Sequence, residues 1–227
     1  MNAARKLVIF DIDGTLVDSQ ASILASMAHA FAKAGRAQPT RDEALGIVGL
    51  SLPEAMAVLA PDASREEQLQ LAADYKQGPP EHREDGWKVA DSALYEGAAD
   101  AVRALHAEGY ALSAATGKSR RGLDRFLAAH GFDGMFAATQ TADDAPSKPH
   151  PQMILNCLSG TGTAADRAVM IGDTEYDMAM GVAAGVATIG VQWGYHPLPR
   201  IRQAGAQAIA EHFAELPGLV RAALGAP

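Results

Sequence analysis

The chain has 227 residues, which is enough to bury the core of one domain together with a smaller inserted unit. Its 27 acidic and 19 basic side chains give a net charge of −8 without a basic stripe, so we expect no nucleic-acid partner. The single cysteine, Cys157, excludes a disulfide framework and a cysteine-based zinc site, and it fits a cytoplasmic location.

The first predicted element is a buried strand over Leu7–Phe10, a continuous apolar run. Asp11 and Asp13 follow it directly, and Gly14 then turns the chain. Open α/β sheets bind ligands at the carboxyl ends of their strands, so we expect both carboxylates to project into one mouth. Two acids held so close repel each other, and the mouth therefore needs a cation, a shared proton, or both.

Residues 20–88 contain amphipathic helical stretches and no strand pattern. A helical block inserted after the first strand predicts a separate cap over 20–88, with the core formed by 1–19 and 89–227. Such an insertion can fold over the mouth and exclude water. Between two of its helices, Gly49–Ser51 is either a loop that faces the mouth or a simple turn. The predicted cap helices are Ala21–Ala34, Arg41–Val48, Pro53–Leu59 and Arg65–Lys76.

After the cap, short apolar runs alternate with helical patterns, which predicts a doubly wound parallel sheet of the Rossmann-like α/β class. The further predicted strands are Ala111–Ala115, Met135–Thr139, Ala168–Ile171 and Thr188–Val191. The helices predicted beside them are Ala98–Glu108, Arg120–His130, Pro151–Leu158 and Asp177–Ala184.

A candidate anion site ends the second of these strands, at Thr116 and Gly117. A helix that begins near Ser119 offers unpaired N–H groups to an anion, and glycine allows a close approach of the backbone. The same residues are also compatible with a simple helix cap. A nucleotide-binding P-loop is excluded, because the glycine that it needs five residues earlier is Leu112.

Two further segments of the sequence are expected to place charged side chains at the same mouth. Lys148 precedes Pro149, which keeps it out of helical geometry and holds it on a stiff loop. Asp173 ends the strand Ala168–Ile171, and Asp177 falls in the first turn of the next helix. Oxygen ligands without histidine or cysteine suit Mg²⁺, which shares its coordination shell with water and phosphate.

Taken together, these positions resemble the motifs of the haloacid dehalogenase-like superfamily, and the helical insertion resembles the cap of its phosphoglycolate phosphatase-like subgroup. The resemblance implies that Asp11 attacks phosphorus and carries an aspartyl phosphate, while Asp13 exchanges the proton. It implies that Asp11, Asp173 and the backbone carbonyl of Asp13 hold Mg²⁺. Thr116, the Gly117 N–H and Lys148 would bind the phosphoryl oxygens, with Asp177 supporting Lys148 or the waters of the metal. Many members have asparagine where this chain has Gly117.

The implied activity is that of a phosphoric monoester hydrolase acting on a small metabolite, either phosphoglycolate-like or a sugar phosphate. A phosphosugar mutase of the same superfamily would use the same motifs and stays open. A receiver-type signalling domain is a remote alternative, because receivers lack the cap and the acid at Asp13. Dehalogenases and phosphonate hydrolases likewise lack that second acid. No apolar segment approaches the ~20 residues that cross a bilayer, so we expect no membrane partner, whereas a monomer and a dimer both stay open.

Overall fold

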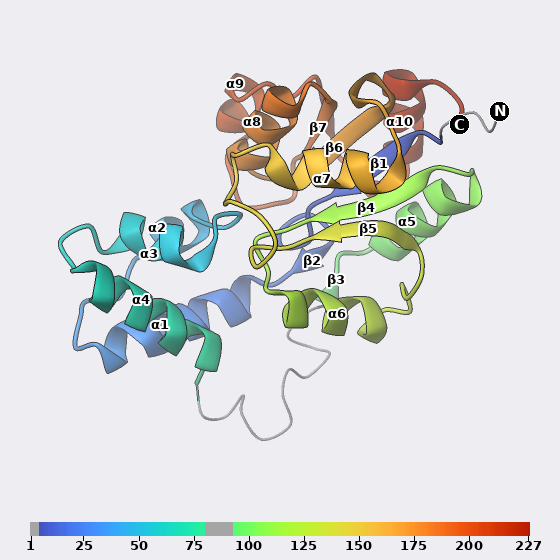
Figure 1. Ribbon diagram of the computed structural model, residues 1–227. Coiled ribbons are helices and arrows are strands. Elements are labelled where there is room, and N and C mark those ends of the chain that lie inside the picture. The colour runs from blue at the N-terminus through green and yellow to red at the C-terminus, as the bar shows by residue number, and fades with distance from the viewer. Residues whose placement is uncertain (1–4, 80–92) are drawn as a thin grey trace.

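The computed structural model describes residues 5–79 and 93–227, and its central element is a six-stranded parallel sheet (Figure 1). The chain winds outward from β1 in both directions, which confirms the predicted doubly wound, Rossmann-like core. Because both neighbours of β1 come from later in the chain, the carboxyl end of β1 opens at the point where the winding reverses. In spatial order the strands are β5 (Phe136–Gln140), β4 (Ala111–Ala115), β1 (Leu7–Phe10), β6 (Ala168–Gly172), β7 (Ala187–Val191) and β8 (Ala208–Ala210).

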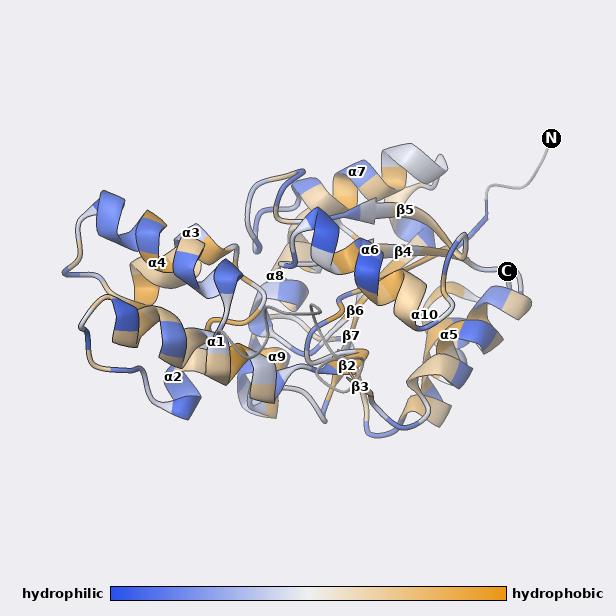
Figure 2. Ribbon diagram, turned by 90° about the horizontal axis from the view of Figure 1, so that it is seen from below, coloured by the Kyte–Doolittle hydropathy of each residue, from blue (hydrophilic) through white to orange (hydrophobic). Residues whose placement is uncertain are grey.

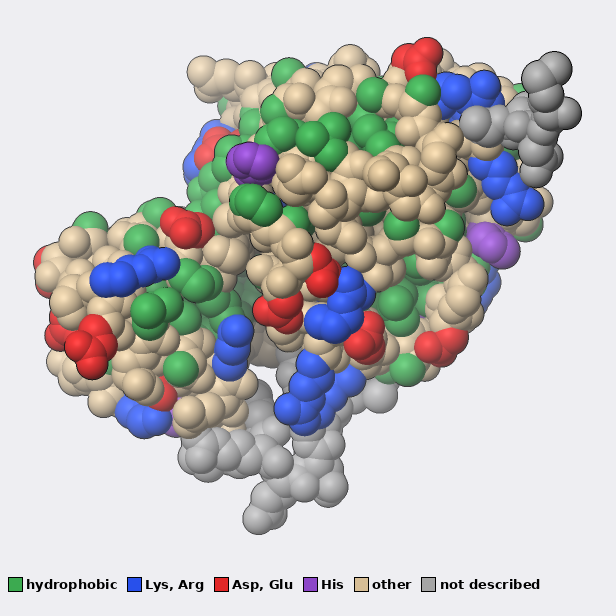
Figure 3. Space-filling model, in the orientation of Figure 1, with side chains coloured by type: hydrophobic (Ala, Val, Ile, Leu, Met, Phe, Trp, Pro, Cys, Tyr) green, Lys and Arg blue, Asp and Glu red, His purple; other side chains and the backbone are tan. Residues whose placement is uncertain are grey.

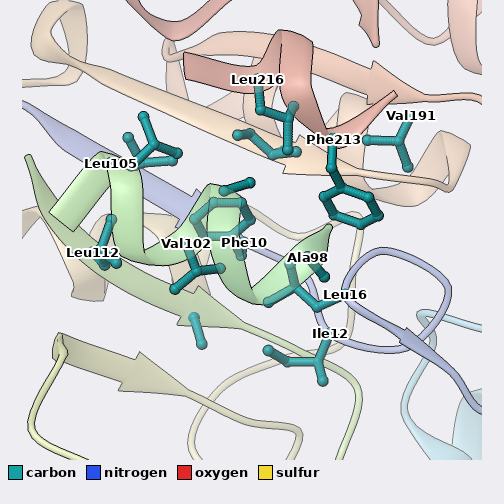
Figure 4. Packing of buried hydrophobic residues seen from close by; sticks show 14 of the residues in the cluster. Phe10, Ile12, Leu16, Ala98, Val102, Leu105, Leu112, Val191, Phe213 and Leu216 are labelled. Atoms are coloured by element: carbon teal, nitrogen blue, oxygen red, sulfur yellow. The ribbon is translucent and has the colours of Figure 1, made fainter. Parts of the chain in front are cut away.

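Helices cover both faces of this sheet and produce two separate apolar layers. Side chains alternate along β1, so Val8 and Phe10 join the layer under α5, α6 and α10, whereas Leu7 and Ile9 join the layer under α7 and α8. Figure 4 shows Phe10 in the first layer, and Figure 2 shows hydrophilic and hydrophobic residues alternating along the covering helices. The helices are α5 (Ala98–Ala107), α6 (Arg120–Ala129), α7 (Gln152–Thr161), α8 (Glu175–Ala184), α9 (Leu198–Gln203) and α10 (Leu216–Leu224).

The four helices that follow β1 form a second unit, here called the cap unit, with an apolar core of its own. Met27 and Phe31 pack there with Met56 and Leu71. In Figure 1 the carboxyl ends of the parallel strands point toward this unit. Its boundary predicted at residue 88 lies outside the described residues. The helices are α1 (Gln20–Lys33), α2 (Arg41–Gly46), α3 (Leu52–Leu59) and α4 (Arg65–Gln77).

Several short elements were not predicted. A two-stranded antiparallel ribbon pairs β2 (Val17–Asp18) with β3 (Ala93–Leu94), next to α1 and α5 in the chain. Strands of two or three residues, such as these and β8, are too short to show a periodic pattern. In the described ranges, no helix has the length and apolar character that crossing a membrane requires.

Candidate active site

Asp11 stands immediately beyond β1, at the carboxyl end of the central strand. Its backbone N–H donates to the Ile171 carbonyl at 2.9 Å, so the pairing with β6 continues through this residue. The side chain is 1% exposed, and neither carboxylate oxygen accepts a hydrogen bond of good geometry from a described residue. The chain then turns at Gly14 with φ +79°, where a Cβ atom would overlap the Asp173 carboxylate. The sheet therefore places two buried acceptor oxygens at the site.

Lys148 holds a buried ammonium group between two of the predicted acids. Its Nζ donates to Asp177 Oδ1 at 2.7 Å and lies 2.9 Å from Asp11 Oδ1. Burial acts against the charged form, but the two carboxylates outweigh it and raise the pKa of Lys148 above its ordinary range. The lysine is therefore a fixed positive charge inside the site.

Asp177 is held from two directions. Thr174, the N-cap residue of α8, donates to Asp177 Oδ2 through its backbone N–H at 3.1 Å and its hydroxyl at 2.7 Å. Lys148 occupies the other oxygen. Gly172 permits this approach, since a Cβ there would lie 2.4 Å from Asp177 Cγ. The arrangement suits the support of Lys148 that the sequence predicts for Asp177.

Asp173 is fully buried beside Asp11, and two groups fix its carboxylate. The Thr15 hydroxyl donates to Oδ1 at 2.8 Å, and the Tyr195 N–H donates to Oδ2 at 2.9 Å. Burial, together with the charges of Asp177 and Asp11, raises the pKa of Asp173 well above its ordinary range. Burial likewise raises the pKa of Asp11 from 3.8 to about 7, although the nearby Lys148 opposes the shift.

These three acids fit a hard divalent cation. Ligand oxygens of Asp11, Asp173 and Asp177 lie within 4.8 Å of one another. When all three are ionised, the single ammonium of Lys148 leaves two negative charges uncompensated in a buried site. An all-oxygen donor set with free Asp11 oxygens matches the preference of Mg²⁺. The predicted ligand role of the Asp13 carbonyl stays a prediction.

Asp13 lies apart from this cluster, with its side chain 15% exposed toward the cap unit. The Ser19 hydroxyl donates to Asp13 Oδ1 at 2.5 Å, and Lys118 Nζ lies 2.7 Å from the same oxygen. The sequence patterns do not single out Ser19 or Lys118 as site residues, although Lys118 adjoins the predicted anion loop. The two carboxylates that open the motif thus face different partners.

Thr116 and Gly117 lie beyond the end of β4, and the cap unit touches them. Thr116 is fully buried, and its hydroxyl accepts from the Lys118 N–H at 3.2 Å. A Cβ at Gly117 would lie 3.0 Å from the Leu50 carbonyl oxygen and 3.1 Å from that of Gly49. The loop between α2 and α3 therefore faces the mouth. A methyl group at position 117 would therefore require this loop to move by a few tenths of an ångström.

A cavity of about 890 Å³ separates the cap unit from the ends of the strands. Asp11, Asp13 and Thr116 line it from the core. Figure 3 shows Lys and Arg side chains on both walls of the hollow between the two units. Among the cations that line this cavity, three form no ion pair within the described part of the chain: Lys76 of α4, and Arg121 and Arg125 of α6.

The chain matches a family model of the haloacid dehalogenase-like hydrolases over residues 8–191. It belongs to that family. The match runs from β1 to β7 and includes Asp11, Asp13, Thr116, Lys148, Asp173 and Asp177, whereas Tyr195 lies beyond it. The resemblance inferred from the motifs is confirmed, and the family's hydrolase class applies to this chain.

Three relatives carry phosphatase names. "Probable phosphatase IndB" of Dickeya dadantii is 33% identical over 221 residues, covering 97% of this chain and 95% of that protein. Pyrophosphatase PpaX of Bacillus pumilus is 32% identical over 187 residues and covers 82% of each chain. Phosphoglycolate phosphatase of Haemophilus influenzae is 28% identical over 221 residues, covering 95% of this chain and 98% of its own. This member of the family is accordingly an enzyme of the phosphoric monoester hydrolase type.

Solved structures share the whole fold. A hydrolase from Pseudomonas syringae superimposes with a TM-score of 0.84 at 21% identity, covering 96% of this chain and 99% of its own. A structure from Bacteroides vulgatus, titled "Putative beta-phosphoglucomutase", superimposes with a TM-score of 0.81 at 25% identity, covering 97% and 90%. The core with its cap unit thus occurs in structures titled as a hydrolase and as a putative mutase.

Proposed function

We propose that the protein is a magnesium-dependent phosphatase that hydrolyses a small phosphorylated metabolite through an aspartyl phosphate on Asp11. The observation that carries this proposal is the buried Asp11 carboxylate, which has no hydrogen bond of good geometry and opens into the cavity beside Lys148. Apart from the Lys148 ammonium 2.9 Å from Oδ1, no described group satisfies its oxygens, which would be costly for a carboxylate with a purely structural role. A nucleophile needs free oxygens aimed at the substrate.

The residues divide the reaction between them. An Asp11 oxygen attacks the phosphorus atom, and the bond from phosphorus to the leaving alkoxide breaks. Asp13 gives its proton to that alkoxide. Asp13 then takes a proton from the water that attacks the aspartyl phosphate, which releases inorganic phosphate and restores Asp11.

Charge stabilisation comes from groups around the transferred phosphoryl group. Lys148, the Thr116 hydroxyl and the Gly117 N–H would hold its oxygens, and Asp177 keeps Lys148 in place. Mg²⁺, held by Asp11 and Asp173, would neutralise phosphoryl charge and allow Asp11 to stay ionised against its raised pKa. Ser51 N–H donates to the Ser147 hydroxyl at 2.7 Å, so the cap unit also contacts the loop that carries Lys148.

The test is steady phosphate release from p-nitrophenyl phosphate with Mg²⁺, and its loss in chelator. We expect Asp11→Asn to lower turnover by more than about a thousandfold, because the amide is no nucleophile. Asp100→Asn, an exposed acid of α5 remote from the cavity lining, serves as the matched control and should retain full activity. Turnover by Asp11→Asn well above trace would refute the nucleophile assignment.

The cations of the cavity further support a substrate with a second anionic group, such as the carboxylate of a phosphoglycolate-like ester. Arg121 lies in the first turn of α6, where the helix dipole disfavours cations, and Arg125 lies four residues further on, where the two like charges repel. Neither has a described acidic partner to offset this cost. An anionic substrate tail between them and Lys76 would supply one.

The matching experiment compares phosphoglycolate with phosphoglycolamide, its uncharged analogue of the same size. We expect the wild-type protein to prefer the carboxylate by about tenfold or more in kcat/KM, as for a charge-assisted hydrogen bond. The double variant Arg121→Ala/Arg125→Ala should lose most of that preference. Arg202→Ala, an exposed arginine of α9 outside the cavity, should keep it. An unchanged preference in the double variant would contradict the second-anion assignment.

A phosphosugar mutase is the second candidate, supported by the Bacteroides vulgatus structure. It would return the phosphoryl group from Asp11 to a sugar hydroxyl instead of to water. Phosphate release that requires no bisphosphate primer favours the phosphatase. Isomerisation of a sugar phosphate that starts only after a bisphosphate is added would favour the mutase.

A further inference from the structure

The loop that follows β7 crosses the site and brings one residue, Tyr195, against both halves of it. Its backbone N–H donates to Asp173 Oδ2 at 2.9 Å. Its hydroxyl lies 2.9 Å from the backbone nitrogen of Ser19 and 3.1 Å from the Ser19 Oγ. The proposed function gives Tyr195 no role, yet its backbone contacts the metal-side acid and its side chain reaches the neighbour of Asp13.

The loop is packed too closely for these contacts to be incidental. A Cβ at Gly194 would lie 2.0 Å from Asp173 Cβ, and one at Gly14 would lie 2.8 Å from Tyr195 Cδ2. On the other side, Trp193 donates its indole N–H to the Thr15 carbonyl at 3.0 Å and stacks on Phe213 with ring centroids 4.1 Å apart. Backbone and side chains therefore fix the place of the Tyr195 ring.

The hydroxyl groups of Tyr195 and Ser19 form a chain of hydrogen bonds that ends on the Asp13 carboxylate. Ser19 has a single hydroxyl proton and donates it to the Asp13 carboxylate at 2.5 Å. Ser19 Oγ can then accept from the Tyr195 hydroxyl, which itself accepts from the Ser19 N–H.

This chain of hydrogen bonds selects one oxygen of Asp13. Ser19 and Lys118 both hold Oδ1. No hydrogen bond links Oδ2 to a described residue, and Asp13 lines the cavity. Oδ2 is therefore the oxygen that can carry a proton to a leaving group, provided that the carboxylate does not rotate.

We propose that Tyr195 is a positioning residue, which acts through Ser19 to hold Asp13 with Oδ2 toward the leaving group. The proposal rests on the proposed function of Asp13. Because Ser19 is also the residue that precedes α1, the same contact ties the start of the cap unit to the loop after β7. Through its side chain and its backbone N–H, Tyr195 thereby positions Asp13, the cap unit and the Asp173 carboxylate relative to one another.

Tyr195→Phe tests the proposal because it removes the hydroxyl and retains the N–H that binds Asp173. The measurement is kcat/KM on two substrates, p-nitrophenyl phosphate and an alkyl phosphate that the wild-type protein hydrolyses. Nitrophenolate leaves without much help from an acid, whereas an alkoxide needs the proton. We expect about a tenfold loss on the alkyl phosphate, as for one lost hydrogen bond in the transition state, and less than about twofold on the nitrophenyl ester.

Three comparisons separate positioning from a general structural role. Ser19→Ala should show the same dependence on the leaving group, and the double variant should be no worse than the poorer single variant, since both act through one chain. The Mg²⁺ concentration for half activation should not change in Tyr195→Phe. Tyr110→Phe removes a hydroxyl that bonds the Gly225 carbonyl far from the cavity, and it should affect neither substrate.

Equal losses on both substrates, or no loss on either, would overturn the role of Tyr195. Absence of any phosphate release by the wild-type protein would instead refute the proposed function, so the two failures are distinguishable. Additive losses in the double variant would show that Ser19 and Tyr195 act separately, which also contradicts the proposal.

Discussion

Lys148 is the single residue on which the charge balance of the buried site depends. It faces Asp11 and Asp177 at 2.9 and 2.7 Å, and its side chain is fully buried. A buried ion pair contributes little net stability, because desolvation offsets attraction, but removing one partner leaves the other charge without compensation. Lys148 thus compensates the negative charges of Asp11 and Asp177 even before substrate binds.

We therefore expect Lys148→Met to abolish turnover and to destabilise the metal-free fold by about 3–5 kcal/mol at pH 8. The loss should shrink at pH 5.5, where Asp11 can take up a proton. Urea unfolding in chelator at both pH values measures it. Arg221→Met is the control: Arg221 and its partner Glu108 are 47% and 32% exposed, so we expect less than about 1 kcal/mol. Equal effects of the two variants would show that Lys148 is not special.

Asp11 gives the site a pH dependence whose sign is fixed by its raised pKa. Burial lifts that pKa from 3.8 to about 7, so the metal-free fold holds a proton that the unfolded chain has already released. This contribution to stability is fully present below pH 3.8 and is lost as the pH rises to about 7. A cation that binds the ionised carboxylate must displace the proton.

The stabilisation by Mg²⁺ should consequently increase with pH. We expect the rise in Tm on adding Mg²⁺ to be clearly larger at pH 8 than at pH 5.5, and to vanish at both pH values in Asp11→Asn. Differential scanning fluorimetry with and without chelator measures it. A shift that is independent of pH would mean that Mg²⁺ does not compete with the proton on Asp11.

Among the elements, strand ends were the part of the site that the sequence could predict. Asp11, Asp173 and Thr116 each follow an apolar run, and parallel strands bring such positions to one edge. Ser19 and Tyr195 could not be predicted, because they meet across 176 residues through a turn and a loop without a periodic pattern. Contacts between loops depend on tertiary packing, which local patterns do not record.

The boundaries of elements show the same limit. The helix expected from Asp177 begins at Glu175, because Thr174 and Asp177 form a capping box that includes the acid in the first turn. The helix expected to end at Leu158 continues to Thr161, where Gly162 ends it with φ +65°. In both cases the residue pattern indicated the helix, and the capping residues set its length.

The loop between α2 and α3 gives a prediction that concerns two elements at once. In Gly117→Ala the new methyl group would lie 3.0 Å from the Leu50 carbonyl oxygen, so the loop must move by a few tenths of an ångström. We expect a several-fold lower kcat/KM and a stability loss of about 1 kcal/mol, as for mild overpacking. Gly160→Ala lies within α7 against the Ala138 side chain at 3.5 Å, and it should be neutral or slightly stabilising. Full activity in Gly117→Ala would show that the loop contact is dispensable.

For the whole molecule, the net charge and the charges that line the cavity act on an anionic substrate in opposite directions. A net charge of −8 repels anionic metabolites, whereas Lys76, Arg121 and Arg125 line the cavity into which a substrate must enter. Solvent-exposed charges are screened by salt over about 10 Å at 0.1 M. The sign of the salt effect therefore reports which charges the substrate meets.

We expect kcat/KM for a doubly anionic ester to fall as salt is raised to about 0.5 M, because the local cations lie closer to the substrate than the distributed acids. The dependence should weaken or reverse in Arg121→Ala/Arg125→Ala. Steady-state kinetics at constant Mg²⁺ measures both. A rate that rises with salt in the wild-type protein would show that the net negative charge dominates.

The central position of β1 also determines the order in which the parts of the site assemble during synthesis on the ribosome. β1 leaves first, but its neighbours β4 and β6 are more than a hundred residues downstream, and Tyr195 follows later still. At 5–20 residues per second, the strand that precedes Asp11 waits roughly five to thirty seconds for β4 and β6. The cap unit, whose helices contact one another locally, can fold during that interval. Asp11, the proposed nucleophile, is thus among the first site residues to be synthesised and among the last to be enclosed.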